Sequence, residues 1–165
     1  ARSLNEIARG AKAQSARDIR QEVNLKIGDI KREIKDQKAK ASTPIESQAA
    51  IIFYSDTPMP LVKFQARRKV MGRSKVTRTP LYGVSVKVKK ERKVVKGAFL
   101  ATMKNGKVGI FWRQGKSRLP IAERFGPNIS QVASNDTIRE KIRQQVETRY
   151  AQIFNRNLAF YLSRQ

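Results

Sequence analysis

The sequence predicts an α+β protein, in which an antiparallel β-sheet is packed by a long C-terminal helix and an N-terminal helical segment precedes the sheet. Three observations support this class. Apolar residues recur at helical spacing near both ends of the 165-residue chain. In the middle, apolar and polar residues alternate along one segment, as in a half-buried strand. An Asn-Gly pair between two further strand patterns indicates a hairpin, so helices flank a sheet in chain order.

The first predicted helix covers residues 3–22. Ser3 is the expected N-cap, and Glu6, three residues later, completes a capping box. The less polar stripe of this helix consists of Leu4, Ala8, Ala11, Ser15, Ile19 and Val23. The opposite face is basic. Because the helix starts almost at the first residue and no methionine precedes it, we expect the natural chain to extend further at this end.

A second, shorter helix is expected at residues 27–35, where three isoleucines share one side. The polar segment 35–44 ends in Ser-Thr-Pro, which predicts a linker or loop. We therefore divide the chain into a basic N-terminal helical segment, residues 1–40, and an α+β body, residues 41–165.

Short strands are predicted at residues 49–55 and 61–64, separated by a turn that contains two prolines. Residues 65–80 are basic and poor in apolar anchors, so we expect a long exposed loop whose order depends on a partner. The next segment, residues 82–90, alternates valine with serine and lysine and gives the clearest strand pattern.

The predicted hairpin spans residues 98–113, with Asn105-Gly106 at its turn because both residues tolerate a positive φ. A long helix is expected at about residues 135–163, with Asn135 as its N-cap. The apolar stripe of this helix consists of Ile138, Ile142, Val146, Tyr150, Ile153, Phe154, Leu158, Tyr161 and Leu162. We expect that stripe to cover one face of the sheet.

Charge is the dominant feature of the composition. Lysine and arginine number 36 against 13 acidic residues, which gives a net charge of +23. An excess of this size attracts nucleic acid, anionic membranes or acidic protein surfaces. The longest apolar run, residues 49–54, is far too short to cross a bilayer, and no membrane partner is expected.

The residue inventory argues against an enzyme. The chain contains no cysteine and no histidine, which removes thiolate nucleophiles, disulfides and the commonest general base and metal ligand. The acidic residues form no catalytic cluster in the sequence. We therefore expect no catalytic, cofactor-binding or metal-binding residues.

The segment GIFWRQGKSRLP, residues 109–120, contains the Gly-Lys-Ser that ends a phosphate-binding P-loop. A P-loop has four residues between its first glycine and Gly-Lys-Ser, and a helix starts at once. Here five residues separate Gly109 from Gly115, and Pro120 follows only three residues after Ser117. The spacing predicts a turn and excludes a nucleotide site of this type.

Basic side chains are concentrated in two segments, which are the candidates for contact with a polyanion. They are Arg67, Arg68, Lys69, Arg73, Lys75 and Arg78 in the predicted loop, and Lys87, Lys89, Lys90, Arg92, Lys93 and Lys96 along the following hairpin. A solvated face is the alternative explanation. The excess over acidic residues favours a partner surface, whose affinity for phosphates would be sensitive to salt and blind to base sequence.

Phe111 and Trp112 occupy adjacent strand positions, so one ring is expected in the core and the other at the surface. A base-stacking platform is one interpretation of the exposed ring. Simple packing of both rings is favoured, because no second strand with regularly spaced aromatic residues accompanies them.

The run VKGAFLATMKNGKVGIFWRQGKSRLPIAERFGPNISQV, residues 95–132, is distinctive as a whole. It resembles the prophage minor tail protein Z family of tailed bacteriophages through Gly97-Ala98-Phe99, Arg118-Leu119-Pro120-Ile121 and Phe125-Gly126-Pro127. The basic opening segment, which contains IRQEVNLKIGDIKREI, is similar to the N-terminal half of that family. The likeness spans nearly the whole chain but offers no match for residues 65–80.

The resemblance implies a structural protein of the virion, assembled in the bacterial host cytoplasm and located in the neck, at the head-proximal end of the tail. Its implied task is tail completion, which makes the tail competent to join the filled head. The implied partners are other tail and head–tail connector proteins, expected to offer acidic surfaces, and further copies of the chain in a ring of six. The candidate assembly contacts are Phe111, Trp112, Arg118, Leu119, Pro120, Phe125, Gly126 and Pro127.

Two other functions stay open from the sequence. A stand-alone module that binds nucleic acid non-specifically would explain the charge, and its affinity would fall steeply with salt. A tail protein would contact DNA only weakly in addition to its protein partners. An enzyme that depends on a metal or on carboxylates would need several acidic residues brought together in one pocket.

Overall fold

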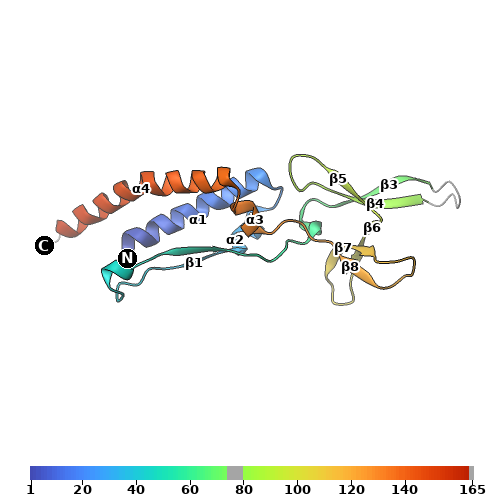
Figure 1. Cartoon of the computed structure of the whole chain (residues 1–165), viewed down its shortest axis with the longest axis horizontal. Coiled ribbons are helices and arrows are strands. Elements are labelled where there is room, and N and C mark those ends of the chain that lie inside the picture. The colour runs from blue at the N-terminus through green and yellow to red at the C-terminus, as the bar shows by residue number, and fades with distance from the viewer. Residues whose placement is uncertain (74–79, 164–165) are drawn as a thin grey trace. The chain divides into compact units, whose positions relative to one another are not determined.

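The computed structural model describes residues 1–73 and 80–163 and confirms the predicted α+β class. The chain divides into two compact units, which Figure 1 shows in the colours of the sequence. The first unit consists of Ala1–Gln21, Ile27–Asp56 and Ile129–Gln165. The second consists of Glu22–Lys26 and Thr57–Asn128. Each unit therefore joins segments that lie far apart in the sequence.

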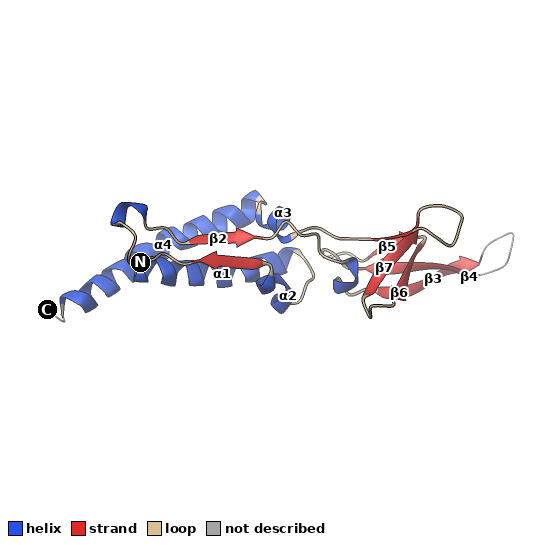
Figure 2. Ribbon diagram, turned by 90° about the horizontal axis from the view of Figure 1, so that it is seen from below, coloured by secondary structure: helices blue, strands red, loops and turns tan. Residues whose placement is uncertain are grey.

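The first unit contains two long helices and a small antiparallel sheet (Figures 1 and 2). Its elements are α1 (Arg2–Glu22), α2 (Ile27–Arg32), β1 (Ile34–Gln37), a 3-10 helix (Ile45–Ser47), β2 (Ile51–Tyr54), α3 (Ile129–Ala133) and α4 (Asp136–Leu162). β1 pairs with β2 in antiparallel register, with Ile34 opposite Tyr54. α1 and α4 run in opposite directions, because the end of α4 meets the start of α1.

The predicted amphipathic helix at the N-terminus is present as α1. It buries Ala11, Ser15 and Ile19 of the predicted stripe, and also Ile7, Ala16 and Asp18, which the predicted stripe did not include. The predicted capping box is wrong. The helix begins at Arg2, and the hydroxyl of Ser3 accepts a hydrogen bond from Asn157 Nδ2 at 3.1 Å. A tertiary contact with α4 therefore uses the side chain that was expected to cap α1.

The boundaries predicted for the second helix and for the linker after it are also wrong. α2 ends at Arg32, and β1, Ile34–Gln37, spans the end of the predicted helix and the start of the predicted linker. Ile34 is fully buried, and Lys12 Nζ on α1 lies 2.6 Å from Asp36 Oδ1. Pairing with β2 satisfies backbone N–H and C=O groups of β1, which in a linker would form hydrogen bonds to water.

The second unit contains two antiparallel sheets of three strands each. The first sheet has the order β3 (Arg67–Arg73), β4 (Pro80–Val86), β5 (Lys93–Lys96), and the second has the order β6 (Ala98–Thr102), β7 (Val108–Arg113), β8 (Ile121–Glu123). A 3-10 helix, Leu61–Lys63, precedes β3. The core of this unit consists of Val23, Leu25, Met59, Leu61, Phe64, Val84, Val86, Ala98, Ile110 and Phe111.

Three sequence predictions in this unit need correction. Residues 61–64 form a 3-10 turn, in which Leu61 and Phe64 are both buried, and not a strand. Residues 67–73 of the predicted loop form β3, because backbone pairing with β4 orders a segment that has few apolar anchors. Residues 74–79 of that predicted loop lie outside the described residues. The predicted strand 82–90 ends at Val86, since β4 turns there toward β5.

The hairpin predicted at residues 98–113 is confirmed as β6 and β7, with Phe99 opposite Phe111. At its turn only Gly106 has a positive φ, of 77°, and its N–H donates to the carbonyl of Met103 at 2.9 Å. The Asn105 side chain accepts a hydrogen bond from the N–H of Lys107 at 3.1 Å. α4 also starts as predicted, because Asn135 Oδ1 accepts from the N–H of Thr137 at 3.1 Å.

Gly126→Ala is expected to lower the free energy of unfolding by about 1–3 kcal/mol, because its Cβ would overpack the core of the second unit. The new Cβ would lie 2.7 Å from Cε2 of Phe64, which is fully buried. Gly115→Ala is the control, since no atom lies within 4 Å of its Cβ, and its effect should stay within about 0.5 kcal/mol. Urea unfolding of both variants measures the difference, and equal stabilities would contradict the packing described for Phe64.

Candidate functional site

The net charge is divided unevenly between the two units. The second unit contains 20 of the lysines and arginines and only 3 acidic residues, a net +17. The first unit contains 16 basic and 10 acidic residues, a net +6. The attraction for a polyanion, which the sequence predicted for the chain as a whole, is therefore concentrated in the second unit.

The sheet β3–β4–β5 arranges several of the predicted polyanion contacts on one face. The strand register sets Lys69, Gly83 and Lys96 opposite one another, and it sets Arg67 opposite Ser85. Because residues two apart on a strand share a face, Arg67, Lys69 and Lys96 lie on the same side of this sheet. Gly83 has no side chain, so only a bare backbone separates Lys69 from Lys96, at roughly 10 Å across two strand spacings.

Other predicted contacts are placed differently. Arg68 lies on the opposite face of β3, beside Phe99 and Leu100 of the neighbouring sheet. The connection from β4 to β5 forms an open cavity of about 450 Å³, which is lined by Glu22, Val88, Lys89, Lys90, Glu91 and Lys93. Its two carboxylates offset part of its positive charge, while Lys87 is half-buried beside it. Arg73 belongs to β3, and Lys75 and Arg78 lie outside the described residues.

The side chain of Arg92 stabilises the connection between β4 and β5, in which Arg92 lies. Its Nη1 donates to the carbonyl of Gln65 at 2.8 Å and to the carbonyl of Ser85 at 3.3 Å. Gln65 in turn donates to Asn24 Oδ1 at 3.2 Å, and the N–H of Asn24 donates to the carbonyl of Val88 at 2.8 Å. The guanidinium of Arg92 thus holds the base of the connection that presents Lys89 and Lys90, and sequence reasoning gave no sign of this structural role.

The predicted assembly contacts fall into a buried group and an exposed group. Phe111 is buried and contacts Phe99, with 6.3 Å between ring centroids. Trp112 is half-buried, and the Arg124 guanidinium lies 4.1 Å from its ring centroid. Gly126 is confined by Phe64, and its N–H donates to the carbonyl of Met59 at 2.7 Å.

The exposed group is Arg118, Leu119, Pro120 and Phe125. The first three lie in the loop after β7, which is closed by a hydrogen bond from the N–H of Gln114 to the carbonyl of Pro120 at 3.2 Å. Gly115, Lys116 and Ser117 form bends in this loop, and no helix follows them, so the predicted turn replaces a P-loop. Pro127 is half-buried next to Gly126.

A third surface was not predicted from the sequence. Five apolar residues on the second half of α4 are between 43% and 63% exposed, and we call them the α4 stripe: Tyr150, Phe154, Leu158, Tyr161 and Leu162. Helical periodicity identified them as apolar but assigned them to the core. The available signal was the charge, because the last 13 residues of α4 contain a single charged residue, Arg156.

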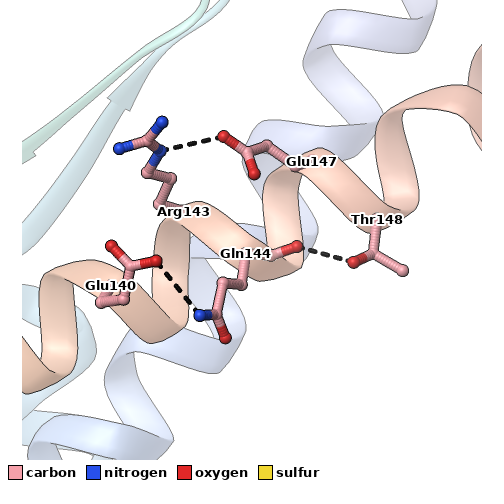
Figure 3. Close-up of polar contacts among 5 residues, drawn as sticks. All are labelled: Glu140, Arg143, Gln144, Glu147 and Thr148. Carbon is pink, nitrogen blue, oxygen red and sulfur yellow. Dashed lines mark hydrogen bonds and ion pairs between the residues drawn. The ribbon is translucent and has the colours of Figure 1, made fainter.

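The first half of α4 exposes a different surface. Arg143 Nε donates to Glu147 Oε1 at 2.9 Å, and Gln144 Nε2 donates to Glu140 Oε1 at 3.1 Å (Figure 3). Thr148 Oγ1 donates to the carbonyl of Gln144 at 2.8 Å. These pairs at a spacing of four residues are typical of a helix face in contact with water.

Ion pairs connect α1 to α4 and to β1 in the first unit. Arg156 Nη2 lies 2.5 Å and 2.6 Å from the two carboxylate oxygens of Glu6, and this hydrogen bond holds the pKa of Glu6 below its usual value. The hydrogen bond from Lys12 likewise lowers the pKa of Asp36. Burial against α1 raises the pKa of Tyr54. The shifts of Glu6 and Asp36 therefore reflect ion pairs that connect elements of the unit, and the shift of Tyr54 reflects its burial.

Within residues 1–73 and 80–163, no group of three or more acidic side chains is placed to hold a metal ion. None of the helices in the described chain combines the length and the apolar character that a membrane span requires.

Comparison with known proteins identifies a family for this chain. The family model described as prophage minor tail protein Z (GPZ) matches residues 1–165, the full length of the chain. No curated protein and no solved structure matches it.

Lys90→Ala is expected to weaken binding to heparin and to lower the slope of log affinity against log salt by about 1, without changing stability. Arg92→Ala is expected to lower the free energy of unfolding by about 1 kcal/mol, because it releases the carbonyls of Gln65 and Ser85. Heparin affinity across a salt series and urea unfolding separate the two effects. Identical behaviour of both variants would contradict the distinction between these side chains.

Lys116→Ala is expected to leave ATP and GTP binding unchanged, since the loop of Lys116 has neither the spacing nor the following helix of a P-loop. Equilibrium dialysis should detect only the salt-sensitive attraction that any polyanion feels. Tight binding that requires Mg²⁺ and disappears in Lys116→Ala would overturn this assignment.

Proposed function

We propose that this chain, which belongs to the prophage minor tail protein Z family, completes the phage tail at its head-proximal end and makes it competent to join the filled head. The family is one of structural tail proteins and not of enzymes, so a structural role in the phage tail is the starting point. The proposal adds the location in the neck and the task of tail completion. Assembly in the host cytoplasm belongs to the same proposal.

The observation that carries the proposal is the division of charge between the units. A net +17 on the second unit suits a protein that docks on acidic rings of a tail or connector, or on phosphates of the packaged DNA. Leu119 and Phe125 in the same unit offer exposed apolar side chains, which an electrostatic contact alone does not require. Protein partners are therefore favoured as the principal neighbours.

Non-specific binding of nucleic acid is the second candidate function. The basic face with Arg67, Lys69 and Lys96 favours it, because rows of cations bind phosphates regardless of sequence. A dedicated DNA-binding protein would hold generic duplex at physiological salt. A tail protein would bind such DNA weakly and would bind completed tails in preference to it.

Tails purified from a phage that lacks this chain test the function directly. Addition of the purified chain is expected to restore joining to filled heads, counted by electron microscopy and by infectious titre. A reconstruction of the particles should place its density at the head-proximal end of the tail. Density elsewhere along the tail, or equal joining without the chain, would contradict the proposal.

We further propose that six copies form a ring on the tail, which would together carry a charge of +138, six times that of one chain. The screening length at physiological salt is about 8 Å, comparable to the distance across a subunit contact. Repulsion therefore opposes ring closure unless an anionic surface lies against the basic faces.

The free chain is accordingly expected to sediment as a monomer at low salt and to form the ring only on tails or with a polyanion. Sedimentation at about 0.05 M salt, with and without heparin, measures this difference. A stable hexamer at low salt without polyanion would show that apolar subunit contacts outweigh the charge.

A further inference from the structure

Within the described part of the first unit, the side chains of the α4 stripe are left about half exposed. Val146 and Arg149 of α4 lie against Ile7 and Ala11 of α1, so this side of α4 faces α1. At about 100° per residue, Tyr150, Phe154 and Leu158 are rotated progressively away from that side, by roughly 70°, 110° and 150°. The α4 stripe begins at the stacked rings of Tyr150 and Phe154, whose centroids are 5.9 Å apart.

The same helix face changes character along its length. Between residues 140 and 148 this face carries the hydrogen-bonded polar pairs of Figure 3, which are stable when exposed to solvent. From Tyr150 onward it carries aromatic and aliphatic side chains that are about half exposed. Contiguous apolar surface of this kind on a soluble chain marks a contact site.

Charge limits what can cover the stripe. Between Tyr150 and Leu162, α4 contains one charged side chain, Arg156, and both carboxylate oxygens of Glu6 are within 2.6 Å of it. On a chain of net charge +23, the stripe is therefore a surface where a second copy can approach without juxtaposing like charges. The residues beside it, such as Ala151 and Asn155, are also uncharged.

We propose that two copies of the free chain pair through their α4 stripes as antiparallel helices related by a two-fold axis. The stripe is centred on residue 156, so an antiparallel pair sets Phe154 of one copy against Leu158 of the other. This pairing closes on itself. It is thus a state of the free chain, and the contacts of the proposed ring lie on other surfaces.

The basic units decide the direction of the pair. The chain passes from the second unit to the first at Asn128–Ile129, shortly before α4 begins at Asp136. Parallel helices would bring these connections, and two units of net +17, to the same end. In the antiparallel pair the starts of the two α4 helices are about 60 Å apart, at 1.5 Å per residue from the centre. That distance is many times the screening length.

The contact is small. Aromatic side chains bury about 150–250 Å² each, so half-exposed residues contribute roughly 100 Å² apiece and the pair buries about 1,000 Å² in total. This lies at the lower end of specific interfaces and predicts a weak, reversible dimer. Salt should strengthen the dimer by screening the remaining repulsion, whereas it would weaken a contact with a polyanion.

Sedimentation equilibrium of the purified full chain tests the pair without any phage component, so its outcome is independent of the proposed function. At about 100 μM, the apparent mass is expected to rise from 18.8 kDa toward twice that value between about 0.05 M and 0.5 M salt. Phe154→Asp and Leu158→Asp should each weaken dimerisation at least about tenfold. Phe53→Asp is the matched control, since Phe53 is 50% exposed on β2 of the same unit, and it should dimerise like the unchanged chain.

Because the chain has no cysteine, single cysteines report the direction of the helices. A mixture of Phe154→Cys and Leu158→Cys chains should form disulfide dimers under mild oxidation, faster than either variant alone. Circular dichroism confirms that each variant is folded. A monomer at every salt concentration, a dimer indifferent to Phe154→Asp and Leu158→Asp, or faster cross-linking of Phe154→Cys with itself would each overturn the proposal.

Discussion

Repulsion among 36 basic side chains is the constraint that the rest of this structure accommodates, because folding brings like charges closer together. The two units meet it in different ways. The first unit joins its helices and strands with ion pairs, including Lys12 with Asp36 and Arg156 with Glu6. The second unit has only three acidic residues, of which Glu123 pairs with Lys107, and it places most of its cations on strand faces and connections that water can reach. Its core is almost entirely apolar, with Phe64 and Ile110 at its centre.

This division also decides which surfaces are left for partners. Arg156 and Asn157 attach the last turns of α4 to Glu6 and Ser3 of α1, which fixes the rotation of the helix about its axis. With its rotation fixed in this way, α4 presents the α4 stripe away from α1. The first half of α4 presents polar side chains, which are stable in contact with water. The first unit therefore exposes apolar surface and little net charge, while the second exposes charge and only isolated apolar side chains such as Leu119.

Local signals explain which elements the sequence predicts well. The hairpin with Gly106 and the capped helix α4 depend on residues that are close together in the chain, and both are present. β3 depends on a remote partner, since Arg67 pairs with Ser85 and a run of arginine and lysine has no apolar alternation. Periodicity also shows that a helix has an apolar stripe without showing what covers it. For that reason the stripe of α4 was assigned to the core, and the anchoring role of Arg92 could not be seen.

Electrostatic and apolar surfaces do different work in an assembly. A basic face such as that of Arg67, Lys69 and Lys96 raises the rate of encounter with any anionic surface, but it does not distinguish a tail ring from bare DNA. Discrimination requires side chains that fit closely against one neighbour, so that water is excluded from that contact and not from contacts with other surfaces. In the described chain the exposed apolar side chains that can supply it lie at separate places, among them Ile45 in the first 3-10 helix, Phe53 on β2, Leu119 and Phe125 near β8, and the α4 stripe. Specific assembly therefore depends on these uncharged apolar sites. The basic second unit determines the rate at which the chain encounters an anionic partner.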